Sequence, residues 1–388
     1  MNPATTAADA RTAKTSQENP LRLLHNFGQS VWLDYIRRDL FTSGELQRLI
    51  DEDGLRGMTS NPSIFEKAIA GSADYTDTLK QLKARNLPAA DIYEAIAIQD
   101  IQSAADRLHG VYQSSNRQDG YVSLEVSPKL ARSTQASIEE ARRLWKAVGR
   151  ENIMIKIPGT TEGLPAIRQL ISEGINVNIT LLFAQEAYVK VAEAYIAGLE
   201  GYKGNDICRI ASVASFFVSR IDTNVDALLN TKLKTPDGQE QLYRSLLGKI
   251  AIANAKQAYR RYGTIFSGNR WKALADRGAQ VQRLLWASTS TKNPSYRDVM
   301  YVEELIGPET VNTIPPATLD AFRDHGKVSR TLDAELEAAD KIMADLERAG
   351  VSMRAVTDQL LEEGIKLFDD AFDKLIAAVD QSKPEPGK

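Results

Sequence analysis

A single lysine lies in a short apolar segment near the middle of the chain. Residues 152–158 read Asn-Ile-Met-Ile-Lys-Ile-Pro, and Lys156 is the charged residue of this segment. As a strand, the segment places its three isoleucines on one face and Lys156 on the other. A lysine among apolar neighbours loses its proton more readily, and a neutral amine attacks carbonyl groups to form a Schiff base. The alternative is an edge-strand lysine that extends its amine to water.

Two other apolar segments carry a carboxylate on one face. Glu125 alternates with apolar residues in 121–126, and Asp34 does so in 31–35. An unpaired buried charge costs free energy. We therefore expect Glu125, Asp34 and Lys156 to lie at the same depth around a polar pocket, where they neutralise one another. Scattered partial exposure of all three is the alternative. A Schiff-base enzyme needs a lysine and acid/base groups, and these three residues supply them.

Uncharged polar residues accompany this set. Asn178 and Thr180 share one face of the segment 175–181, while its isoleucines, valine and leucine take the other. Asn61 follows a further candidate strand, and Pro62 disfavours helical backbone at Asn61 and helps to end that strand. These side chains could hold substrate hydroxyl groups or a water molecule that relays protons.

Eight candidate strands alternate with helical segments along the chain. We expect strands at 30–36, 55–59, 121–126, 152–158, 175–181, 208–217, 282–287 and 311–315, and helices at 89–110, 134–148, 185–201 and 239–262. This alternation predicts an α/β fold with a parallel sheet, and an eight-stranded (β/α)8 TIM barrel is its simplest closure. An open doubly wound sheet is the alternative, although no Gly-x-Gly-x-x-Gly follows a strand. In a barrel, polar interior residues cluster at the strand carboxyl ends.

The elements predict one domain over residues 20–380, with additional N- and C-terminal helices. Residues 331–380 read as two helices, and the second carries an apolar stripe at helical spacing: Leu361, Ile365, Phe368, Phe372, Ile376 and Val379. The stripe indicates packing against the barrel; a lid over the active site or a dimer contact are alternatives. Residues 1–19 and 381–388 are expected to be flexible tails.

Composition limits the possible partners. The chain has 388 residues with 48 Lys and Arg against 51 Asp and Glu and no basic block, which argues against nucleic acid. No segment approaches the roughly 18 apolar residues of a membrane span, and no signal peptide is evident. The single cysteine, Cys208, lies in an apolar run and is expected to be a buried structural thiol. The three histidines match no metal-ligand spacing. We expect a cytoplasmic protein.

Basic residues follow two of the late strands. Arg220 ends the segment 214–220, and Ser288 and Lys292 lie in 286–292. Loops after the late strands of a barrel often bind phosphate, and a guanidinium group suits phosphate geometrically. Taken singly, each basic residue is more often a solvated surface charge.

The sequence resembles the transaldolase family, in its longer bacterial branch. The motifs that carry the resemblance lie at 32–35 (WLDY), 59–63 (TSNPS), 123–126 (SLEV), 155–158 (IKIP) and 176–183 (NVNITLLF). They occur in the family's order, and the similarity spans about residues 20–380. The resemblance implies a barrel that transfers a three-carbon dihydroxyacetone unit without a cofactor or metal. It implies sedoheptulose 7-phosphate or fructose 6-phosphate as donors, and glyceraldehyde 3-phosphate or erythrose 4-phosphate as acceptors.

The resemblance also assigns roles to residues. It implies that Lys156 forms the Schiff base, that Glu125 acts through a water also held by Thr180, and that Asp34 takes the proton of the cleaved hydroxyl group. The substrate-binding residues it implies are Asn61, Thr59, Asn178, Ser215, Phe217, Arg220 and Ser288, with Lys292 as a further candidate. Many relatives have arginine at the position of Ser290, and Lys292 would replace it without a bidentate fork.

Two other functions remain as alternatives. A fructose 6-phosphate aldolase would use the same lysine but release free dihydroxyacetone. That group usually has Gln at the position of Glu125 and Tyr at that of Phe217, so the residues here favour the transferase. A non-catalytic barrel that binds sugar phosphates would not need the acid/base set. The sequence leaves a monomer and a homodimer equally open.

Overall fold

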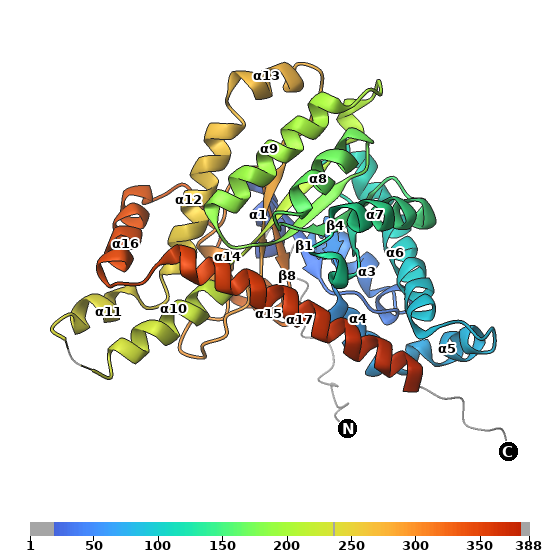
Figure 1. Ribbon diagram of the computed structural model, residues 1–388, viewed down its shortest axis with the longest axis horizontal. Coiled ribbons are helices and arrows are strands. Elements are labelled where there is room, and N and C mark those ends of the chain that lie inside the picture. Colours follow the sequence, from blue (N-terminus) through green and yellow to red (C-terminus); the bar gives the residue numbers. More distant parts are fainter. Residues whose placement is uncertain (1–18, 236, 382–388) are drawn as a thin grey trace, which may run out of the picture.

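The strands form a closed barrel in a computed structural model of the chain, which describes residues 19–235 and 237–381. Each strand pairs in parallel with its neighbours in sequence, and β1 pairs with β8. The strands are β1 (Gln29–Asp34), β2 (Gly57–Thr59), β3 (Tyr121–Glu125), β4 (Ile153–Pro158), β5 (Val177–Leu182), β6 (Ser212–Phe217), β7 (Arg283–Ala287) and β8 (Thr310–Ile314). The predicted (β/α)8 TIM barrel is confirmed (Figure 1).

Helices surround the barrel and connect its strands (Figure 1). They are α1 (Pro20–Asn26), α2 (Asp39–Thr42), α3 (Glu45–Asp53), α4 (Pro62–Ala70), α5 (Thr76–Lys83), α6 (Ala89–Ser114), α7 (Thr134–Val148), α8 (Gly163–Ser172), α9 (Gln185–Gly201), α10 (Ser219–Lys232), α11 (Glu240–Leu246), α12 (Ile250–Ile265), α13 (Asn269–Ala275), α14 (Met300–Glu303), α15 (Pro316–His325), α16 (Leu336–Arg348) and α17 (Met353–Gln381). Short 3₁₀ turns are η1 (Ala73–Tyr75), η2 (Pro128–Leu130) and η3 (Ile207–Arg209). Among the described residues we find no helix whose length and hydropathy would let it cross a bilayer.

A tryptophan inside the barrel requires a glycine on the neighbouring strand. Trp32 of β1 is fully buried, and a Cβ at Gly57 of β2 would lie 2.5 Å from its Cε2 atom. The indole Nε1 donates a hydrogen bond of 3.3 Å to Asp119, which precedes β3. Packed side chains therefore fill the barrel below its carboxyl end, and the polar residues further along the strands remain for chemistry.

The sixth strand is shorter than the predicted segment 208–217. It begins at Ser212, and Cys208 lies in the 3₁₀ turn η3. Ile207 of this turn and Ile210 directly after it are buried, whereas Cys208 is exposed and donates its thiol hydrogen to Asp206. Burial of residues three apart is the pattern of a 3₁₀ turn rather than a strand. The expectation of a buried structural thiol at Cys208 was therefore wrong.

The segment 239–262 forms two helices instead of one. Helix α11 ends at Leu246 and α12 begins at Ile250. Between them Gly248 has a φ of +70°, and a Cβ there would lie 2.7 Å from the Tyr296 ring. Only glycine adopts this conformation at low cost. The helical periodicity continues across the break, which is why the sequence pattern did not reveal it.

The two predicted C-terminal helices are α16 and α17. Helix α17 packs against α4 and α6 and also against α10, so it crosses the barrel (Figure 1, red). Its buried apolar residues are Val356, Leu360, Phe368, Leu375 and Val379, while Leu361, Ile365, Phe372 and Ile376 are half-buried. At the chain ends, Asn19 is the N-cap of α1 and α17 continues to Gln381. The rest of the predicted tails lies outside the described residues.

Asp222 and Asp226, one turn apart on α10, accept hydrogen bonds from neighbouring segments of the chain. Asp222 accepts hydrogen bonds from the backbone N–H of Ala251 and from the Tyr301 hydroxyl, both at 2.8 Å. Asp226 accepts one of 2.6 Å from the Tyr296 hydroxyl. Burial raises the pKa of Asp222 to about 7, because the carboxylate loses its hydration. Helix α10 is thereby tied to α12 and to the segment between β7 and β8.

We expect Asp222→Asn to reduce the pH dependence of the free energy of unfolding between pH 3.8 and about 7. The folded state holds this proton more tightly than the unfolded state, so the stabilisation is full below pH 3.8 and is lost as pH rises through about 7. The effect reaches at most about 1.4 kcal/mol per pH unit. Urea unfolding at several pH values measures it, with Asp77→Asn, at an exposed position, as the control for removing one charge. Identical pH profiles for wild type and Asp222→Asn would contradict the assignment.

Candidate active site

Lys156 and Glu125 form an ion pair inside the barrel. They are Cα partners on the adjacent strands β4 and β3, and Lys156 Nζ lies 3.1 Å from Glu125 Oε2. Lys156 is 5% exposed, and its Nζ also donates a hydrogen bond of 2.9 Å to the carbonyl oxygen of Ser60. The edge-strand alternative for Lys156 is excluded, because β4 lies within a closed barrel.

Asp34 lies on the same interior side, at the end of β1. Its Oδ1 accepts a hydrogen bond of 2.7 Å from the Thr59 hydroxyl, which also contacts the hydroxyl of Thr313 at 2.6 Å. Burial raises the pKa of Asp34, and the Thr59 hydrogen bond and the charge of Lys156 oppose this shift. Burial likewise raises the pKa of Glu125; Lys156 opposes the shift and Asp34 adds to it. The two carboxyl groups and the lysine therefore act on one another electrostatically.

Two buried polar atoms near the ion pair have no hydrogen bond to a described residue. They are Oε1 of Glu125 and the hydroxyl oxygen of Thr180, whereas Oε2 of Glu125 is engaged by Lys156. Thr180 follows Asn178 on β5, and Asn178 is the Cα partner of Lys156. Buried polar atoms are normally paired, so unpaired ones indicate a place for a polar ligand or water.

Asn178 is held in a fixed orientation by its neighbours on β3 and β6. Its Oδ1 accepts a hydrogen bond of 2.6 Å from the Ser215 hydroxyl, and its Nδ2 donates one of 3.0 Å to Ser123 Oγ. Asn178 is fully buried. Because both ends of the amide are engaged, the side chain can present its remaining hydrogen-bonding capacity in one direction.

Asn61 has a structural task at the start of α4. It is the N-cap of this helix, and its Oδ1 accepts a hydrogen bond of 3.0 Å from the backbone N–H of Ile64. This cap is the local reason for the Asn-Pro pair that follows β2. The Nδ2 group of Asn61 can then still donate to a ligand at the carboxyl end of the barrel.

Two cations lie close together at the carboxyl ends of β6 and β7. Burial lowers the pKa of Lys292, and the charge of Arg220 lowers it further. Lys292 Nζ donates a hydrogen bond of 2.7 Å to Ser290 Oγ, and the Arg220 guanidinium lies 5.5 Å from the centre of the Phe217 ring. Arg220 has no ion pair within 4.0 Å among the described residues. Two partly desolvated cations that repel each other favour an anion between them.

Ser288 joins this group through the start of α10. Its hydroxyl contacts the Ser219 hydroxyl at 2.9 Å, one residue before Arg220. Ser288 also has a φ of +56°, which is uncommon outside glycine and directs the chain sharply at the end of β7. The candidate site thus has a deep part around Lys156 and a cationic rim at Arg220 and Lys292.

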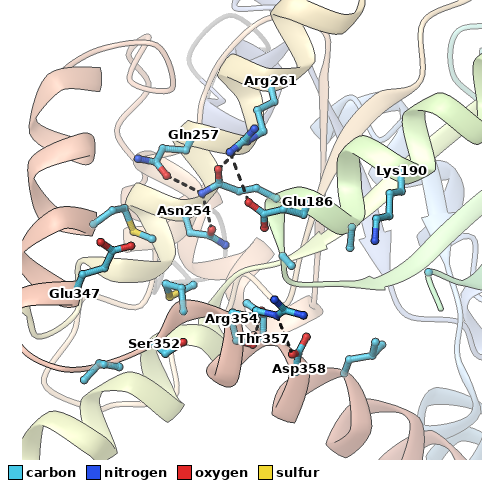
Figure 2. A pocket seen from close by; sticks show the side chains of 18 of the residues that line it. Glu186, Lys190, Asn254, Gln257, Arg261, Glu347, Ser352, Arg354, Thr357 and Asp358 are labelled. Atoms are coloured by element: carbon cyan, nitrogen blue, oxygen red, sulfur yellow. Dashed lines mark hydrogen bonds and ion pairs between the residues drawn. The ribbon is translucent and has the colours of Figure 1, made fainter. Parts of the chain in front are cut away.

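A separate cleft of about 1220 Å³ lies beside α17 and contains none of the predicted site residues. Figure 2 shows its polar side chains, which come from α9, α12 and the C-terminal helices. Several of these side chains form ion pairs: Arg261 lies 3.6 Å from Glu186, and Arg354 lies 3.8 Å from Asp358. These pairs are exposed to solvent, unlike the buried pair of Lys156 and Glu125.

Sequence reasoning missed three contributors to the interior, whereas the alternation in 121–126 does place Ser123 on the inner face beside Glu125. Ser60 binds Lys156 through its carbonyl oxygen, which no side-chain pattern can indicate. Thr313 lies on a strand that was predicted, at a position that alternates with outward apolar residues, so the period-two pattern could have found it. Phe368 of α17 lies with its ring centre 5.9 Å from Lys156 Nζ, and only the fold brings them together.

The fold and these side chains define a class of protein. A (β/α)8 barrel carries its chemistry at the carboxyl ends of its strands. Here those ends present an amine, two carboxyl groups of raised pKa and a pair of cations. A buried lysine beside an acid/base group is typical of enzymes that form a Schiff base with a carbonyl substrate.

Comparison with known proteins gives the family. A family model described as Transaldolase/Fructose-6-phosphate aldolase matches residues 31–379. A transaldolase of Trichodesmium erythraeum is 50% identical over 369 residues, which cover 94% of this chain and 97% of that protein. A "Transaldolase 2" of Nostoc punctiforme is 50% identical over 369 residues (93% and 97%), and a transaldolase of Thermobifida fusca is 46% identical over 366 (94% and 98%). The chain belongs to the transaldolase/fructose-6-phosphate aldolase family.

The ion pair predicts a strong coupling between its two members. Glu125→Leu leaves the Lys156 ammonium buried without its partner and should lower the free energy of unfolding by about 3–5 kcal/mol. Adding Lys156→Met to this variant removes the unpaired charge and should recover most of the loss. Urea unfolding of the two single variants and the double variant measures the coupling. Additive effects of the two substitutions would contradict a direct pair.

Proposed function

We propose that the protein is a transaldolase that works through a Schiff base on Lys156. It transfers a dihydroxyacetone unit from a ketose phosphate, sedoheptulose 7-phosphate or fructose 6-phosphate, to an aldehyde, glyceraldehyde 3-phosphate or erythrose 4-phosphate. The observation that carries the proposal is the buried pair of Lys156 and Glu125 at 3.1 Å inside the barrel. The relatives named transaldolase, about half identical over nearly the whole chain, support the same reaction.

The first step joins the ketose to the lysine. Glu125 takes a proton from the Lys156 ammonium, and the neutral amine attacks the carbonyl carbon to give a carbinolamine. Glu125 then returns a proton to the departing hydroxyl group, which leaves as water and yields the iminium. The raised pKa of Glu125 suits both directions of this proton transfer. The unpaired hydroxyl of Thr180 supports a role in holding a water that relays these protons.

The second step breaks the carbon–carbon bond. Asp34 takes the proton of the hydroxyl group on the carbon atom that becomes the aldehyde carbon. The carbon–carbon bond breaks, the aldehyde leaves, and the electron pair of this bond passes to the iminium to form an enamine. The Thr59 hydrogen bond orients Asp34 for this task. Asn61 and the fixed amide of Asn178 hold the ketose hydroxyl groups. Addition of the acceptor aldehyde reverses these steps.

The cationic rim supplies the phosphate site. Arg220 and Lys292 lie near one another, and Ser288 is held beside them by Ser219. A phosphate group would neutralise the two cations and place the reacting carbon deeper in the barrel, toward Lys156. Ser215 contributes by fixing Asn178, and Phe217 by lying under the guanidinium of Arg220.

The finer context is also a proposal. We propose a single domain over residues 20–380 that acts in the cytoplasm as a monomer or homodimer, without a metal, cofactor, nucleic acid or membrane partner. The nearly balanced charge, with 48 basic and 51 acidic residues, supports the lack of a nucleic-acid partner. The lone cysteine supports a reducing compartment.

Borohydride reduction with fructose 6-phosphate tests the Schiff base directly. We expect a three-carbon adduct on Lys156, with little free dihydroxyacetone until an aldehyde acceptor is added. Lys156→Met should lower turnover by at least roughly 10³-fold while the protein remains folded. Lys256→Met is the matched control, because Lys256 is also buried but donates to the carbonyl oxygen of Ala334 outside the barrel interior.

Each other outcome of this experiment has a definite meaning. Sustained release of dihydroxyacetone without an acceptor would make the protein a fructose 6-phosphate aldolase, against the indication of Glu125 and Phe217. An adduct on another lysine, or full activity of Lys156→Met, would reject the proposed function.

Lys292→Ala tests the phosphate site. We expect KM for fructose 6-phosphate to rise about 10- to 100-fold, the value of one charge-assisted hydrogen bond, with a small change in kcat. Turnover of unphosphorylated fructose should change little. Lys203→Ala, at an exposed position, is the control. Equal losses with both sugars would show that Lys292 does not bind the phosphate.

A further inference from the structure

We propose that Phe368 of α17 keeps water away from the intermediate on Lys156, so that transfer to an aldehyde outruns release of dihydroxyacetone. This inference rests on the proposed function, since it concerns the fate of the enamine on the same lysine. It assigns to the C-terminal helix the choice between a transferase and an aldolase outcome.

The choice depends on how the enamine is protonated. For release, the enamine carbon takes a proton from solvent, water adds to the resulting iminium carbon, and the carbon–nitrogen bond breaks. The products are dihydroxyacetone and the free amine of Lys156. For transfer, the enamine carbon instead forms a bond to the acceptor aldehyde before water is needed. Excluding solvent from the enamine therefore favours transfer.

Phe368 occupies one side of the reacting nitrogen. Lys156 Nζ contacts Glu125 Oε2 at 3.1 Å and the Ser60 carbonyl oxygen at 2.9 Å, and the Phe368 ring centre lies 5.9 Å away. This distance is within the range of a cation–π contact. Phe368 is itself 5% exposed. The ring is thus a buried apolar neighbour of the amine, and it offers no hydrogen bond to water.

The neighbours of Phe368 on α17 hold the ring in place. Asp369 and Asp373 lie 3.5 and 2.8 Å from Lys129 Nζ in η2, which follows the strand of Glu125. Phe372 packs edge-on against Tyr93 of α6, with ring centres 5.8 Å apart. These contacts tie α17 to the segments that follow β3 and precede it, so the ring does not depend on its own packing alone for its position.

The approach of α17 to the strand ends is close. A Cβ at Gly364, one turn before Phe368, would lie 2.9 Å from Leu181 Cδ2 near the end of β5. Leu181 has a φ of +61°, at an irregularity in the pairing of β5 with β6. The helix can therefore lie directly on the strand that carries Asn178 and Thr180. The alternative is that Phe368 only packs α17, in which case its loss would affect stability and leave the fate of the enamine unchanged.

The ratio of release to transfer tests the proposal. Phe368→Ala and Phe368→Leu are compared with wild type in fructose 6-phosphate, with and without erythrose 4-phosphate. We expect the ratio of dihydroxyacetone release to transfer to rise about tenfold or more in Phe368→Ala, and less in Phe368→Leu, as solvent reaches the enamine. In D₂O the released dihydroxyacetone should carry deuterium on the carbon that was bonded to the departed aldehyde.

Leu375→Ala is the matched control, because Leu375 is fully buried on the same helix but lies two turns from Phe368. It should loosen α17 without changing the ratio. An unchanged ratio in the Phe368 variants, or an equal rise in Leu375→Ala, would overturn the proposal; if Phe368→Ala does not fold, Phe368→Leu decides. Borohydride trapping in the same samples separates the two hypotheses, since absence of the Lys156 adduct in wild type would reject the proposed function itself.

Discussion

The arrangement of the barrel interior depends on the buried ion pair of Lys156 and Glu125. Two charges in a closed barrel lose their hydration, and at 3.1 Å each compensates the other. The barrel supplies this geometry through register, because the two residues are Cα partners on adjacent strands. In the proposed reaction the amine must become neutral and the carboxyl group must gain a proton, and the structure holds these two groups in contact. The structure thus provides preorganisation rather than a new charge at the moment of reaction.

The charged residues of the site form two groups at different depths in the barrel. The deep groups are Lys156, Glu125 and Asp34; burial raises the pKa of both carboxyl groups, and the charge of Lys156 opposes these shifts. The rim carries Arg220 and Lys292, and burial and the nearby charge of Arg220 both lower the pKa of Lys292. In the proposed function, the phosphate group of the substrate binds at the rim and its uncharged carbonyl end reaches the deep groups. This proposal gives a ketose phosphate one productive orientation.

Much of this arrangement could be predicted from alternation within strands. Lys156, Glu125, Asp34 and Asn178 were found because a polar residue on the interior face interrupts an apolar pattern of period two. The features that could not be predicted have physical causes. The backbone at Cys208 accepts a hydrogen bond from Gln280, and Gly248 lies against Tyr296; both partners are distant in the sequence. The position of Phe368 over the lysine is a matter of tertiary packing, since a helical stripe does not identify its partner.

The course of α17 across the barrel has a consequence for the order of folding. The helix packs on α4, which follows β2, and on α10, which follows β6, so its full docking surface exists only after both halves of the barrel have closed. Contacts between such distant parts of the chain form late, because the entropy of loop closure must be overcome first. From the contact order we expect the strands to be in place before α17 docks beside Lys156. In that order of folding, the surroundings of the reactive lysine are completed last.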